Sequence, residues 1–83
     1  MHLILLGDST IDNKSYTKGG LAVEDHIRAE LGQGSVVERR AEDGGMTSHI
    51  LGQLKDLPST ATHLVLSVGG NDALDQVVYE GVL

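Results

Sequence analysis

Three residues of this 83-residue sequence are of the types that acyl transfer requires, and each comes shortly after a run of strand-forming residues. Ser9 carries a hydroxyl that can attack an ester carbonyl. Gly45, or its neighbour Gly44, has no Cβ, so a backbone N–H there can approach the oxyanion that develops during the attack. Asn71 carries a neutral amide, which is a second kind of oxyanion donor. Together these groups are suited to hydrolysis of an oxygen ester.

The apolar run at residues 3–6 predicts where Ser9 lies in the fold. It has no polar alternation, which favours a short strand buried on both faces, as in the centre of a parallel sheet. Gly7 then frees the backbone to turn. The carboxyl ends of parallel strands form the edge where open α/β sheets bind ligands. We therefore expect Ser9 and Asn71 at one edge, although Gly-Asp-Ser alone is also ordinary turn chemistry.

The rest of the pattern predicts an alternation of strands and helices, β-α-β-α-β with a helical start at the end. Polar and glycine-rich residues at 9–20 indicate a loop, and Glu42 to Thr47 indicate a glycine turn before a helix. The second helix is expected to bury Ile50, Leu51, Leu54 and Leu57 and to end at Pro58. The expected strands cover residues 3–6, 35–41 and 62–68. The expected helices begin at residue 21, after a cap at Thr47 or Ser48, and at residue 73.

Composition narrows the function classes. Six basic and twelve acidic residues give a net charge of −6, which disfavours nucleic acid as a partner. There is no cysteine, and the four histidines lack paired spacing, so we expect neither a metal nor a cofactor. No apolar run is long enough to span a membrane, and no charged leader precedes the first strand. We expect a cytoplasmic protein.

The motifs and their order resemble a known family. Gly7-Asp8-Ser9, then Gly45 before a helix, then Gly69-Gly70-Asn71-Asp72 after a strand look like the first three sequence blocks of the SGNH (GDSL-type) hydrolases. The resemblance extends over essentially the whole chain, residues 1–83, as a single partial domain. It implies a flavodoxin-like three-layer α/β/α sandwich whose parallel strands have the order 2-1-3.

The resemblance also implies roles for individual residues in an esterase or lipase-like site. Ser9 would be the nucleophile and would also donate its backbone N–H to the oxyanion hole. Gly45 would supply a second backbone N–H, a role that Gly44 could take instead, and Asn71 would supply its side-chain amide. Two carboxylates have supporting roles, Asp8 in fixing the turn and Asp72 as a turn or helix-capping residue.

One family block is missing. The Asp-x-x-His that supplies the base and its orienting acid does not occur here, as expected for a truncated domain. His49 is the nearest weak candidate for the base, but a helix N-terminus disfavours the imidazolium that a base must become. Two interpretations follow: a serine ester hydrolase whose base comes from elsewhere, or an inactive fragment or binding and assembly module completed by a partner chain.

The third strand suggests where a partner would bind. In the order 2-1-3 its outer edge is unpaired, and an apolar edge of this kind invites pairing. We therefore expect a homo-oligomer or a complementing chain through strand 62–68 and the tail 77–83, together with a small ester as substrate.

Overall fold

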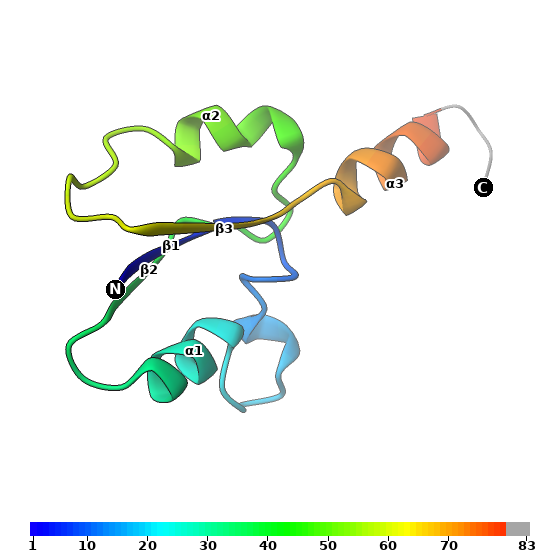
Figure 1. Ribbon diagram of the computed structural model, residues 1–83. Coiled ribbons are helices and arrows are strands. Elements are labelled where there is room, and N and C mark those ends of the chain that lie inside the picture. The colour runs from blue at the N-terminus through cyan, green and yellow to red at the C-terminus, as the bar shows by residue number, and fades with distance from the viewer. Residues whose placement is uncertain (80–83) are drawn as a thin grey trace.

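The computed structural model describes residues 1–79, which form a parallel sheet between helices (Figure 1). The expected α/β class and the alternation of strands and helices are confirmed. The elements are β1 (His2–Gly7), η1 (Lys14–Tyr16), α1 (Val23–Leu31), β2 (Val36–Arg39), η2 (Thr47–His49), α2 (Ile50–Gln53), β3 (His63–Ser67) and α3 (Gly70–Tyr79).

The sheet has the order β2-β1-β3, and both strand pairs are parallel. Leu3 of β1 pairs with Val37 of β2 on one side and with His63 of β3 on the other. The predicted order 2-1-3 is therefore confirmed. Helix α1 covers one face of the sheet and α2 covers the opposite face (Figure 1), so the three layers of an α/β/α arrangement are present. No helix within residues 1–79 has the length and apolar character needed to cross a bilayer.

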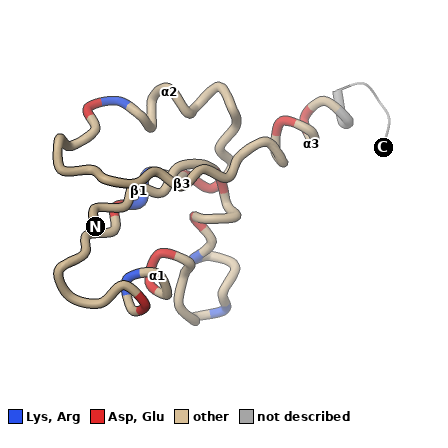
Figure 2. Tube along the Cα trace, viewed as in Figure 1, with Lys and Arg blue, Asp and Glu red and all other residues tan. Residues whose placement is uncertain are grey.

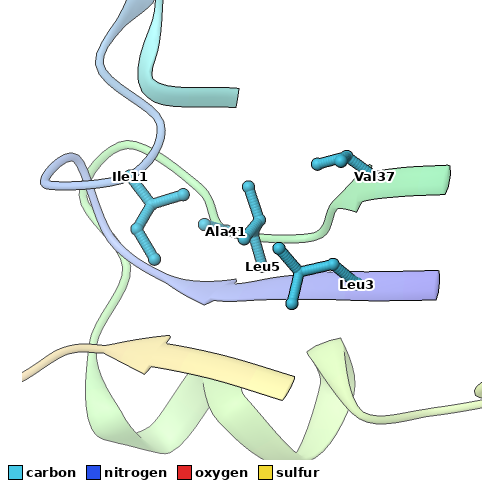
Figure 3. Packing of buried hydrophobic residues seen from close by; sticks show 5 residues of the cluster. All are labelled: Leu3, Leu5, Ile11, Val37 and Ala41. Carbon is cyan, nitrogen blue, oxygen red and sulfur yellow. The ribbon is translucent and has the colours of Figure 1, made fainter. Parts of the chain in front are cut away.

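The core is built on β1, the central strand. Residues 3–8 are all buried, and Ile4 and Leu5 are fully so. Because successive side chains of a strand point to opposite faces, β1 contributes to packing on both sides of the sheet. On the side of α1, Ile27 and Leu31 pack against a cluster of five residues from β1, β2 and the loops that follow them. The cluster consists of Leu3, Leu5, Ile11, Val37 and Ala41 (Figure 3).

Helix α2 departs from the prediction. It was expected to reach Leu57, but it ends at Gln53, and Asp56 adopts a positive φ of 52°. Leu51 was assigned to the apolar stripe and is instead 82% exposed. Gly52 weakens the helix interior, and a chain that reverses at Asp56 cannot continue the stripe.

The other boundaries shift by a few residues. Helix α1 begins two residues later than expected, because the Asp25 carboxylate accepts the Ala22 N–H, at 3.0 Å, and so caps the helix there. Helix α3 begins at Gly70 rather than Ala73, and it extends past the carboxyl end of β3, away from the sheet (Figure 1). Residues 80–83 of the predicted contact tail lie outside the described residues.

Candidate active site

Each of the three strands is followed by a turn, which we call a corner of the site. Gly7 shapes the first corner, which follows β1. Gly7 has a φ of 134°, and a Cβ added there would lie 1.8 Å from the carbonyl oxygen of Ser67. The Asp8 N–H donates to that same oxygen at 3.1 Å. The buried Asp8 carboxylate accepts the N–H of Thr10 at 3.0 Å. Ser9 thus sits, half-buried, between two residues that backbone contacts hold in place.

Gln53, which the sequence pattern did not single out, supports this corner. Its side chain is 5% exposed. Its Oε1 accepts the Gly7 N–H at 2.7 Å, and its Nε2 donates to the Gly7 carbonyl oxygen at 2.9 Å. The amide thus pairs with β1 as a neighbouring strand would, at a point that β2 no longer reaches. A signal did exist, since Gln53 lies three residues after Ile50 and so on the inner face of a helix.

We expect Gln53→Leu to destabilise the fold. The variant has an apolar side chain of similar size, but it leaves the Gly7 N–H without its buried acceptor and removes a donor from the Gly7 carbonyl. An unsatisfied buried polar group costs about 1–3 kcal/mol. Urea denaturation should therefore show a free energy of unfolding lower by at least ~1 kcal/mol. Gln33→Leu, at an exposed position, is the matched control and should leave it nearly unchanged.

The second corner packs directly against the first through Gly45. A Cβ at Gly45 would lie 2.7 Å from the Gly7 carbonyl oxygen, 2.9 Å from that of Glu42 and 3.5 Å from Asp8 Cα. No side chain fits there without moving backbone. Gly44 differs, since its φ is 84° but a Cβ would meet nothing within 4 Å. The two adjacent glycines therefore serve different needs: Gly44 turns the chain and Gly45 allows close approach.

The N–H groups at these two corners are not equally available. The Gly45 N–H, expected as an oxyanion donor, donates to the Glu42 carbonyl at 2.9 Å and so closes its own turn. Within residues 1–79, no hydrogen bond occupies the N–H of Ser9 or of Gly44. The Ser9 and Gly44 N–H groups thus lack a hydrogen-bond partner among the described residues, whereas Gly45 uses its N–H within its own turn and contributes close packing.

The third corner is tied to the second by two neighbouring residues of α3. Asn71 Nδ2 donates to the Gly45 carbonyl oxygen at 2.9 Å. Because an amide nitrogen carries two hydrogens, this bond uses one and sets the direction of the other. The Asp72 carboxylate accepts both the N–H of Thr47, at 2.9 Å, and its hydroxyl, at 2.7 Å. The structure therefore brings Asn71, Gly45 and the Gly7–Asp8 backbone together at one edge of the sheet.

The Thr47–Asp72 contact makes this junction sensitive to acid. The hydroxyl and the N–H of Thr47 both donate to the carboxylate and hold the pKa of Asp72 below its ordinary value. The contact therefore contributes fully above the ordinary aspartate pKa of about 4 and is lost as the pH falls through the lowered value. We expect the Thr47 amide resonance to shift on acidification with a midpoint below ~4. An Asp72→Asn variant should not show this step, and a midpoint above the ordinary value would contradict the contact.

The hydrogen bonding of the His49 ring does not suit a general base. Its Nδ1 accepts the N–H of Met46 at 2.9 Å. A neutral imidazole that accepts at Nδ1 carries its proton on Nε2, so neither ring nitrogen is free to take a proton from Ser9. His49 lines an open cavity of about 770 Å³ beside Arg39 and Arg40, whose lining residues include neither Ser9 nor Asn71.

The loop after Ser9 is fastened to the second corner. The Tyr16 hydroxyl donates to Asp43 Oδ1 at 2.9 Å, and this hydrogen bond raises the pKa of Tyr16. Asp12 Oδ2 accepts the Asp43 N–H at 2.8 Å, and its other oxygen pairs with Arg39. These contacts fasten the loop to the second corner, and Asp12 has a structural role there.

No group of three His, Asp or Glu side chains within the described part of the chain comes close enough together to hold a metal ion. Comparison of the sequence and structure with protein-family models, curated proteins and solved structures finds no match.

Proposed function

We propose that this chain carries the nucleophile and the oxyanion-binding groups of a serine ester hydrolase of the SGNH (GDSL) type, acting on small esters. The observation that supports it best is the hydrogen bond from Asn71 Nδ2 to the Gly45 carbonyl, with Gly45 packed on the backbone beside Ser9. This contact aims an amide donor from the third corner toward the other two. The resemblance of the three motifs to that family provides the independent argument.

In the proposed reaction, Ser9 Oγ attacks the ester carbonyl and forms a tetrahedral intermediate. The negative oxygen accepts hydrogen bonds from the Ser9 N–H and from the second hydrogen of Asn71 Nδ2, with the Gly44 N–H as a further donor. The intermediate expels the alcohol and leaves an acyl-serine, which water hydrolyses to the acid and free Ser9. The hydroxyl proton passes to a general base, which we assign to a group other than His49 or to a buffer molecule. The protonated base then gives this proton to the departing alkoxide.

The test is hydrolysis of p-nitrophenyl acetate, with imidazole added as an external base. We expect turnover above that of the same imidazole-containing buffer without protein, and this difference should rise with imidazole concentration. An oxyanion donor is typically worth about 10²–10³ in rate, so Asn71→Ala should lower turnover by about that factor. Asp75→Ala, exposed on the same helix, is the control and should leave turnover unchanged. Turnover at the buffer rate under all conditions, or equal turnover by Asn71→Ala, would refute the esterase.

A second candidate function is favoured by a different observation. The apolar side chains of β3, namely Leu64, Val65 and Leu66, are all exposed. A module that is completed by another chain would cover them. This candidate does not require catalysis, so the ester assay and an association assay separate the two.

A further inference from the structure

Strand β3 is an apolar strand without charge at the edge of the sheet. Leu64, Val65 and Leu66 are 52%, 42% and 56% exposed. No Lys, Arg, Asp or Glu occurs anywhere in residues 57–71. Figure 2 shows β3 uncoloured, whereas charged residues gather around α1 and the loops. Edge strands usually carry charge to block pairing with another sheet, and β3 has no such protection.

The two edges of the sheet are unlike. At the other edge, β2 includes Glu38 and Arg39, and Arg39 forms ion pairs with Asp12 and Glu24. Among the described residues, β3 pairs on one side alone, with β1. Helix α3 extends past the end of β3 rather than along its edge (Figure 1). The sheet therefore presents one edge suited to pairing and one that resists it.

We infer that the occupant of the β3 edge is a second copy of this chain, paired antiparallel about a two-fold axis at Val65. The pattern Leu64-Val65-Leu66 reads the same in both directions. In this register Val65 faces Val65 of the second copy on one face of the sheet, and each Leu64 faces Leu66 on the other. A two-fold interface must be self-complementary, and this stretch meets that condition in side-chain type and in charge.

Pairing would join two three-stranded sheets with the order β2-β1-β3-β3-β1-β2 and leave the charged β2 strands at both ends. The assembly therefore closes at two copies.

This inference deepens the second candidate function and does not depend on ester hydrolysis, so either can fail alone. Cysteine cross-linking tests it, because the chain contains no cysteine. Directly opposite residues of an antiparallel pair have Cα atoms about 4.5–5.5 Å apart, within the ~4.4–6.8 Å that a disulfide spans. Val65→Cys should oxidise to a disulfide-linked dimer. Leu51→Cys, at an exposed apolar position outside the edge, is the matched control and should remain largely monomeric.

Two further variants fix the register and the driving force. A mixture of Leu64→Cys and Leu66→Cys should cross-link more completely than either variant alone, because these positions face each other. Val65→Lys places two like charges opposite each other, so in sedimentation velocity the unmodified chain should be a dimer and this variant a monomer. A monomeric unmodified chain at high concentration, equal cross-linking by Leu51→Cys, or open-ended assemblies would each overturn the inference.

Discussion

Replacing Ser9 by alanine is expected to reduce hydrolysis of p-nitrophenyl acetate to the rate of buffer alone. Under the proposed mechanism the Ser9 hydroxyl is the nucleophile that forms the acyl intermediate, and alanine offers no nucleophile in its place. The backbone N–H of residue 9 and the Asn71 amide persist in Ser9→Ala, so binding of the ester need not change. The loss should therefore appear in kcat, and in the release of p-nitrophenol in the first turnover.

Two controls sharpen this result. The free energy of unfolding of Ser9→Ala should match that of the unmodified chain, because no hydrogen bond within residues 1–79 uses the Ser9 side chain. Ser48→Ala removes a hydroxyl from the open cavity that also contains His49. It should hydrolyse the ester at the unmodified rate. If Ser48→Ala loses activity and Ser9→Ala retains it, the cavity beside Arg39 and Arg40 is the reactive site instead.

Replacing Gly7 by alanine is expected to unfold the protein. The added Cβ would lie 1.8 Å from the Ser67 carbonyl oxygen, which is backbone of the paired strand. Gly7 cannot move away from Ser67 without cost, because Gln53 also holds the N–H and C=O of Gly7. Changes of more than about 4 kcal/mol come from a few mechanisms, of which backbone strain and overpacking are two, and both act here. That loss is comparable to the entire stability of a small domain, about 5 kcal/mol at the low end.

Gly69→Ala is the matched control for this prediction. Gly69 has a φ of 122°, close to that of Gly7, but a Cβ there would meet nothing within 4 Å. It should therefore show the conformational cost alone, about 1–3 kcal/mol. Circular dichroism in a urea series measures both variants. Equal losses for Gly7→Ala and Gly69→Ala would mean that strain, and not the contact with Ser67, makes glycine necessary at the first corner.

Local pattern was enough to predict the strands and their order along the chain. The unbroken apolar run at residues 3–6 can be satisfied only by burial on both faces, so it predicts a central strand whatever the surroundings. The expectation that Asn71 and the glycine turn share an edge rests on the same logic, since parallel strands end together. These inferences need only the chemistry of neighbours in sequence.

The tertiary structure decided the features that depend on residues far apart. Gln53 reaches Gly7 across 46 positions, and although helical spacing places it on the same face as Ile50, no local rule names Gly7 as its partner. Gly45 looked like a donor because glycine permits close approach, but what approaches it is the Gly7 carbonyl, and its own N–H closes a turn. His49 looked like the nearest base, but the Met46 N–H takes its Nδ1. Residue type predicts which groups a corner contains, whereas the partners of each group depend on how the corners pack.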